Sequence, residues 1–292
     1  MKPFHDQVIK RPVRDGALIG YRLGRVEKQP HAIVMIHGLA SNSTRWTEFV
    51  NDTSLQKHWE LLRIDLRGHG LSLYRGHISR KRWCEDLRDV LAAEHYRDIV
   101  IIGHSQGAQV AMQYAQEDQT GLRGLVLIDP VFDTNLTGTL GVARRLKWLL
   151  WLGVRFLWLL NRLGIRRRHF PLRDLYALDR RTRDYLATHP DKQIADIYMR
   201  PTADFGYIPL ANYLQDVIEV VRPLGPLQTI TCPVLVLLSK GATMSNVDKN
   251  TQIIRQMPNS KIEYIDADHW LLTEKPQQAR AVIEAWVNGL GR

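Results

Sequence analysis

The sequence predicts an α/β protein with a mostly parallel central sheet, helices on both faces of that sheet, and an inserted helical cap. Two observations predict this fold. Short aliphatic runs alternate with helix-compatible segments over residues 1–131 and again over residues 229–292, a pattern typical of a parallel sheet covered by helices. Over residues 132–228 the strand pattern disappears and helical segments dominate. We therefore expect a core formed by the two outer segments, with residues 132–228 as the cap.

The core elements follow from composition and periodicity. Seven segments rich in Val, Ile and Leu are expected to form strands, and several of them end in Gly or polar residues. The expected strands are residues 17–22, 32–36, 60–64, 99–102, 124–128, 234–238 and 261–265. The expected helices are residues 82–95, 108–116, 246–256 and 277–288.

The size and composition of the chain limit its class. A chain of 292 residues can form one large α/β domain with an insertion, or two modest domains. Its two cysteines, Cys84 and Cys232, have no metal-ligand spacing, and a disulfide framework is not expected. The first residues lack the apolar centre of a signal peptide. We expect a cytoplasmic protein with peripheral membrane contact.

The segment from Ile99 to Ala108 carries the clearest chemical signal. A run of β-branched residues leads into Gly103-His104-Ser105-Gln106-Gly107, and a helix-compatible segment follows at once. A serine on so sharp a strand-to-helix turn is held clear of the sheet, and the small residues allow strand and helix to pass closely. The free N–H groups at the helix start point toward whatever the serine attacks. This position predicts that Ser105 is a nucleophile.

Four segments together resemble the α/β-hydrolase family, and the resemblance covers nearly the whole chain outside the cap. They are Ile33–Leu39 with its His-Gly pair, Asp65–Ser72 with the pattern Asp-x-Arg-Gly-x-Gly-x-Ser, Gly103–Gly107, and the late segment from Asp268 to Pro276. The resemblance implies a serine esterase or lipase-like member of that family. It also implies that the backbone N–H groups of Leu39 and Gln106 form an oxyanion hole.

A serine needs a base to take its proton, and His269 is the best candidate because it follows a late strand and precedes the last helix. The alternative is a surface loop histidine. His37, His104 and His69 lie near the same loops but lack a third ligand at suitable spacing, so we expect them to hold loops by hydrogen bonds. We expect neither a metal nor another cofactor.

In the Ser-His-acid triad of this family, a carboxylate orients the histidine. This sequence has no carboxylate at the position where the family usually places it. Alignment on the strand at residues 234–238 puts that position at Ala242. Three carboxylates could replace it. We favour Asp129, which ends the preceding strand, over Asp248, which fits a helix N-terminus, and over Asp268, whose side chain points away from that of its neighbour in an extended segment. A Ser–His dyad is the remaining possibility.

The positive charge of the chain is concentrated in the cap. Between Leu140 and Asp184 lie twelve Lys and Arg residues against three Asp. Residues 146–160 are apolar and rich in tryptophan, but they are too short to span a bilayer. One interpretation is a helix lying in an anionic membrane interface through Leu140–Arg168; the other is a cap helix buried over the active site. No nucleic-acid-binding motif accompanies the charge, and nucleic acid is not an expected partner.

These observations predict a serine hydrolase that cleaves carboxylic esters with hydrophobic or lipid-like acyl groups, such as a monoacylglycerol, through an acyl-enzyme. A thioesterase, an acyltransferase or a carbon–carbon bond hydrolase would use the same residues. The competing class is a weakly active or non-catalytic, membrane-associated protein on the same scaffold. The oligomeric state is not predicted.

Overall fold

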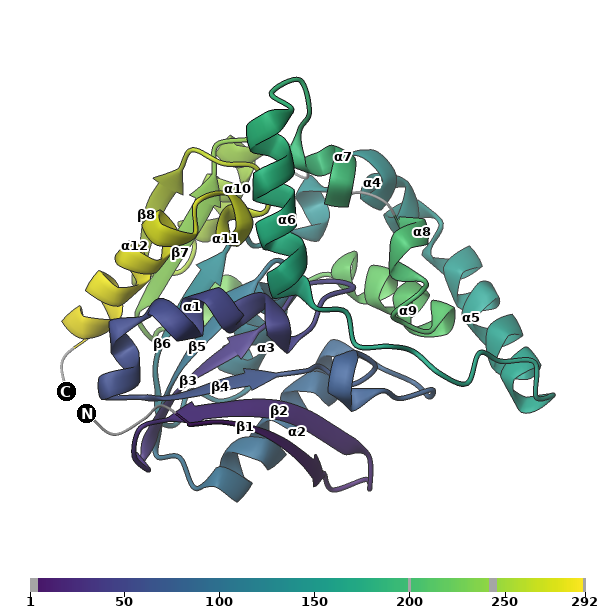
Figure 1. Cartoon of the computed structure of the whole chain (residues 1–292), viewed down its shortest axis with the longest axis horizontal. Coiled ribbons are helices and arrows are strands. Elements are labelled where there is room, and N and C mark those ends of the chain that lie inside the picture. Colours follow the sequence, from purple (N-terminus) through teal and green to yellow (C-terminus); the bar gives the residue numbers. More distant parts are fainter. Residues whose placement is uncertain (1–4, 199–200, 242–245, 291–292) are drawn as a thin grey trace.

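A sheet of eight strands forms the centre of the molecule (Figure 1). The computed structural model describes residues 5–198, 201–241 and 246–290. The strand order is β1-β2-β4-β3-β5-β6-β7-β8. Strand β2 runs antiparallel to both of its neighbours, β1 and β4, and the six strands β3 to β8 are parallel to one another. The mostly parallel α/β fold predicted from the sequence is confirmed.

The strands agree with the sequence prediction except at the N-terminal edge. They are β1 (His5–Pro12), β2 (Leu18–Arg25), β3 (His31–Ile36), β4 (Glu60–Ile64), β5 (Asp98–His104), β6 (Leu122–Ile128), β7 (Val234–Ser239) and β8 (Ser260–Ile265). Strand β1 was not predicted, because it is an exposed edge strand whose residues are mostly polar. Edge strands commonly carry charged residues that prevent further strand pairing, and this composition hides them from a hydrophobicity pattern.

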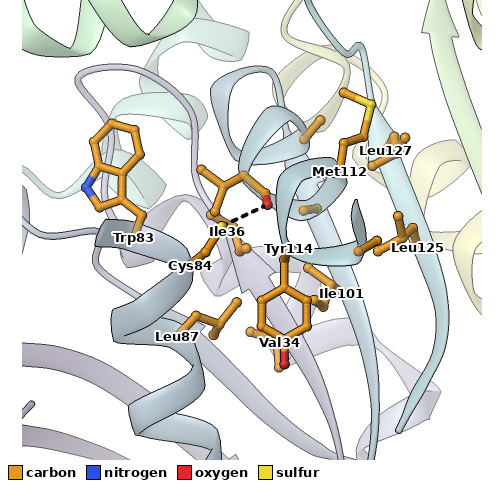
Figure 2. Close-up of a cluster of buried hydrophobic side chains, with 14 of the residues drawn as sticks. Val34, Ile36, Trp83, Cys84, Leu87, Ile101, Met112, Tyr114, Leu125 and Leu127 are labelled. Carbon is orange, nitrogen blue, oxygen red and sulfur yellow. Dashed lines mark hydrogen bonds between the residues drawn. The ribbon is translucent and has the colours of Figure 1, made fainter. Parts of the chain in front are cut away.

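Helices of the core cover both faces of the sheet. The α-helices of the described residues are α1 (Thr47–Asp52), α2 (Arg80–Glu94), α3 (Gln106–Glu117), α4 (Gly138–Arg145), α5 (Lys147–Arg162), α6 (Leu175–Thr188), α7 (Ile194–Tyr198), α8 (Pro201–Asp204), α9 (Leu210–Val220), α10 (Val247–Ile254), α11 (Leu271–Glu274) and α12 (Pro276–Gly289). Alternate residues of β3 separate the two layers: Val34 packs with the α2 and α3 side and Met35 with the α1 and α12 side. Figure 2 shows the first layer, where Trp83 and Leu87 of α2 and Met112 of α3 meet strand residues.

The segment between β6 and β7 folds as helices α4 to α9, with no strand among its described residues. Thus the helical character predicted for this region is present, while its boundaries at residues 132 and 228 stay a prediction.

Helix α9 fastens the segment to the core, because Asn212 donates to the carbonyl of Gly68 at 3.1 Å and the backbone N–H of Ile78 donates to Gln215 at 3.0 Å. In Figure 1, α9 lies beside the sheet and α5 lies outside it, at the margin of the molecule.

Candidate active site

Ser105 lies in a strained turn between β5 and α3. Its backbone has φ 53° and ψ −113°, values that a non-glycine residue rarely adopts. A Cβ added to Gly103 would lie 2.3 Å from the carbonyl oxygen of Gly107, and one added to Gly107 would lie 2.3 Å from that of Ile36. Both glycines are therefore required by close backbone approach, as the sequence predicted for this turn.

Asp129 and His269 meet at the carboxyl ends of the strands although 140 positions separate them. Asp129 follows β6, His269 lies between β8 and α11, and Asp129 Oδ2 is 2.5 Å from His269 Nδ1. The other carboxylate oxygen accepts hydrogen bonds from the backbone N–H of Ser239 at 3.1 Å and from its hydroxyl at 3.0 Å. With Nδ1 donating to the carboxylate, Nε2 of His269 is left as a proton acceptor.

The other candidate carboxylates lie elsewhere. Asp248 is exposed in the first turn of α10 and is not among the residues that line the cavity around Ser105. The Asp268 carboxylate lies against Gly241, and its backbone N–H donates to Glu274 at 3.0 Å. Ala242, the position that alignment on β7 indicated for the acid, lies outside the described residues.

Ser105 and His269 line one cavity of about 240 Å³. Leu39 also lines it, and Gln106 is the first residue of α3, so its backbone N–H has no acceptor within the helix. The rest of the cavity lining comes mainly from the helices between β6 and β7 and from the loop after His269. It includes Leu140, Leu175, Tyr198, Val217 and Trp270. These apolar contributions come from segments far apart in the sequence, and no local pattern indicated them.

Two arginines that the sequence did not indicate also line this cavity. Arg45 is buried, forms an ion pair with Asp179, and donates to the Thr273 hydroxyl at 3.0 Å. Arg173 pairs with Asp204 at 2.5 Å. Because each guanidinium has a carboxylate partner, these arginines add polar groups to the cavity without adding net charge.

Two histidines fix the loops on either side of Ser105. His37 donates from Nδ1 to the carbonyl of Gly38 at 2.8 Å and accepts at Nε2 from the backbone N–H of Leu66 at 3.1 Å. His104 donates from Nε2 to the carbonyl of His269 at 3.0 Å. Burial holds the pKa of His37 well below its ordinary value. Burial, and then the nearby His269, lower the pKa of His104 to about 3. Both rings are therefore neutral supports.

His69 forms a different kind of contact. Its Nε2 lies 2.8 Å from Asp216 of α9, and both side chains are fully buried. Burial opposes the charged imidazolium, but the Asp216 carboxylate outweighs it and the pKa of His69 is raised. This ion pair joins the glycine-rich loop after β4 to the helical segment.

Backbone strain is concentrated around the cavity. In the described chain, the non-glycine residues with positive φ are Ala40, His95, Ser105 and Asp129. His95 ends α2, where a left-handed residue is common. Of the other three, Ala40 and Ser105 line the cavity, and Asp129 carries the carboxylate that is hydrogen-bonded to His269. Residues held in such conformations cluster at functional sites.

A mostly parallel sheet with a Gly-x-Ser-x-Gly turn between a strand and a helix defines the class of α/β hydrolases. The chain matches the family model described as "Alpha/beta hydrolase family" over residues 33–282, and it belongs to this family. An uncharacterized protein of Mycobacterium tuberculosis is 34% identical over 128 residues, which are 40% of this chain and 37% of that protein. The matched segment thus spans well under half of that relative.

Longer matches extend over most of the chain. The sn-1-specific diacylglycerol lipase ABHD11 of Danio rerio is 25% identical over 247 residues, which cover 84% of this chain and 74% of the lipase. The solved structure of a thermophilic esterase from Thermogutta terrifontis has a similar fold, with a TM-score of 0.65, 19% identity, and coverage of 98% of this chain and 100% of the esterase. The protein is thus a hydrolase-family member with esterase and lipase homologues.

In the described residues, no helix is both long and apolar enough to cross a membrane.

The buried neutral state of His104 predicts a pH-dependent stability. Because its pKa in the folded chain, about 3, lies below the ordinary 6.5, only the unfolded chain binds this proton as the pH falls below 6.5. Acidification in this window therefore destabilises the fold. His104→Gln, whose amide can donate to the same carbonyl, should reduce the slope of unfolding free energy against pH, by an amount that approaches about 1.4 kcal/mol per pH unit at the acidic end of this window.

This slope is measured by urea denaturation at several pH values between about 5 and 6.5. The exposed His58 provides the control, since His58→Gln removes a histidine away from the site. A slope for His104→Gln equal to that of the wild type would contradict the assignment.

Proposed function

We propose that the protein is a serine hydrolase that cleaves carboxylic esters through an acyl-enzyme intermediate. The observation that supports this most directly is the 2.5 Å contact between Asp129 and His269, made beside the cavity that Ser105 also lines. Ser105, on its strained turn, is the nucleophile, His269 is the base, and Asp129 is the acid. The carboxylate missing from the usual position is thus replaced by one from the preceding strand.

In this mechanism the Ser105 Oγ attacks the ester carbonyl while His269 Nε2 takes the hydroxyl proton. Asp129 stabilises the imidazolium and keeps Nδ1 protonated. The tetrahedral oxyanion accepts hydrogen bonds from the backbone N–H groups of Leu39 and Gln106, and each such donor typically contributes on the order of 10²–10³ in rate. His269 then gives its proton to the leaving alcohol, and water hydrolyses the acyl-enzyme by the same steps.

The proposed substrate is an uncharged ester with a hydrophobic acyl group. Most of the lining is aliphatic or aromatic, and Arg45 and Arg173 are each neutralised by a carboxylate. A substrate carboxylate would therefore have to compete with an existing ion pair. The volume of about 240 Å³ lies below the roughly 300 Å³ at which pockets for drug-sized ligands begin. This volume favours short or medium acyl chains, while the zebrafish diacylglycerol lipase favours an acylglycerol as the class of ester.

Residues 132–228 are proposed to act as the cap of this site. Leu140, Leu175, Tyr198 and Val217 reach the cavity from four different helices of the segment. The alcohol and acyl parts of the ester would lie between these residues and Ser105. The tryptophan-rich helix α5 contributes no residue to the described lining.

The proposal is tested with a fluorophosphonate probe and a panel of p-nitrophenyl esters of increasing acyl length. The wild type should be labelled stoichiometrically and should hydrolyse short and medium esters, because the probe and the esters react with the same serine. Ser105→Ala should abolish labelling and lower kcat by about 10⁴-fold or more. Folded protein that is not labelled, or Ser105→Ala protein that hydrolyses esters at the wild-type rate, would exclude the proposed mechanism.

The assignment of the acid gives a separate prediction. Asp129→Asn should lower kcat by roughly 10³–10⁴-fold, because the amide no longer stabilises the imidazolium or the required tautomer of His269. Asp248→Asn is the matched control and should retain activity close to the wild type, since that side chain is exposed on α10. Steady-state kinetics on one ester measure both variants. The reverse ranking would identify Asp248 as the acid.

A further inference from the structure

Helix α5 presents a continuous apolar stripe to solvent. Its outward residues recur at intervals of three and four, so they lie on one face of the helix and its C-terminal continuation. Their exposed fractions range from 44% to 68%. They are Trp148, Leu149, Leu152, Phe156, Leu159 and Leu163. A contiguous exposed surface of this kind marks an interaction site rather than chance exposure of single residues.

The opposite face of α5 is already occupied. The helix packs against α9, Val154 is fully buried, and Leu214 of α9 would contact a side chain at Gly153 at 3.4 Å. Trp151 stacks on His77 with a centroid separation of 5.8 Å. Since α9 is itself hydrogen-bonded to the core loops, α5 cannot turn its apolar stripe inward without breaking these contacts.

The surroundings of the stripe are strongly cationic. From residue 134 to residue 173 the chain contains nine Lys and Arg residues and no Asp or Glu. Exposed cations lie on α5 and directly before and after it: Arg145, Lys147, Arg155, Arg162, Arg166 and Arg168. The segment therefore offers a positive surface around an apolar centre, without acidic residues of its own to neutralise it.

We propose that α5 docks this protein on the surface of an anionic phospholipid bilayer. The stripe would enter the boundary between headgroups and acyl chains, and the flanking cations would contact lipid phosphates. Charge complementarity selects this occupant. A second copy of the chain packed through the same face would bring its cations against those of the first. The inference is independent of the esterase proposal, because binding requires no turnover.

The position of the helix relative to the cavity fits a surface-bound protein. Helix α4 leads directly into α5 and extends the exposed apolar surface with Val142, while Leu140 of the same helix lines the cavity. A bilayer contacting α5 would thus lie next to the helix that forms one wall of the site.

The test is vesicle flotation of the full chain. Vesicles of phosphatidylcholine alone are compared with vesicles that contain about 30% phosphatidylglycerol. We expect binding to the anionic vesicles that weakens with added NaCl, and a blue shift of tryptophan fluorescence on binding. Two variants separate the contributions: Trp148→Ser with Phe156→Ser removes apolar surface, and Arg155→Gln with Arg162→Gln removes charge. Each should weaken binding by on the order of tenfold.

Matched controls make the outcome decisive. Leu18→Ser removes an exposed apolar side chain from β2, and Arg180→Gln with Arg181→Gln removes two exposed cations from α6. These variants should bind anionic vesicles like the wild type. Circular dichroism, together with the midpoint of urea denaturation, checks that every variant is folded.

Three results would overturn the proposal. The first is wild-type binding that does not distinguish anionic from neutral vesicles. The second is equal loss of binding in the α5 charge variant and the α6 charge control, with no loss for Trp148→Ser with Phe156→Ser, which would mean that net charge alone is responsible. The third is a dimer in light scattering that Trp148→Ser with Phe156→Ser converts to a monomer without any vesicle binding, which would make a second copy the occupant. None of these results depends on ester hydrolysis.

Discussion

The hydrogen bond between Asp129 and His269 is the contact on which the candidate site depends. It joins the end of β6 to the loop after β8, two places that approach one another only because β6, β7 and β8 are parallel and adjacent. Parallel strands bring their carboxyl ends to one edge of the sheet, and ligand sites of α/β proteins lie at that edge. Ser239, at the end of the intervening strand, fixes the second carboxylate oxygen, so all three strands contribute to one hydrogen-bonded unit.

Much of this arrangement could be predicted from the sequence, because the signals are local. The aliphatic runs predict buried strands, and Gly-x-Ser-x-Gly after such a run predicts the turn that carries Ser105. His269 is recognisable from its place between a late strand and the last helix. Asp129 was weaker as a prediction, since Asp-Pro after a strand is equally consistent with a simple turn. Its positive φ and its partners, which support the assignment, are tertiary properties that no sequence window contains.

The cavity residues that could not be predicted from the sequence depend on contacts between segments far apart in the chain. Arg45 and Arg173 line the cavity while paired with carboxylates that helices between β6 and β7 supply, Asp179 and Asp204. Such long-range ion pairs leave no periodicity along the chain. For α5 the periodicity was clear, but the sequence left two interpretations open. An apolar face predicts burial without specifying whether protein or another apolar phase covers it.

Helix α9 explains why α5 remains exposed. Its residues Asn212, Gln215, Asp216 and Glu219 lie at helical spacing and are all buried, so its polar face is the one turned toward the core. There they bind groups of the loops after β4, including the His69 imidazole and the backbone N–H groups of Ile78 and Arg80. Buried polar groups with such partners fix one orientation of a helix.

The apolar face of α9 is consequently divided between the cavity and α5. Val217 and Val220 line the cavity, and Leu214 approaches Gly153 of α5. These contacts occupy the apolar face of α9, and the outward apolar stripe of α5 remains exposed. The polar contacts that fix α9 on the core therefore leave the apolar stripe of α5 exposed. Helix α9 also contacts the start of α3, directly after the turn that carries Ser105, because the Gln106 side chain donates to the Asp216 carbonyl at 3.4 Å.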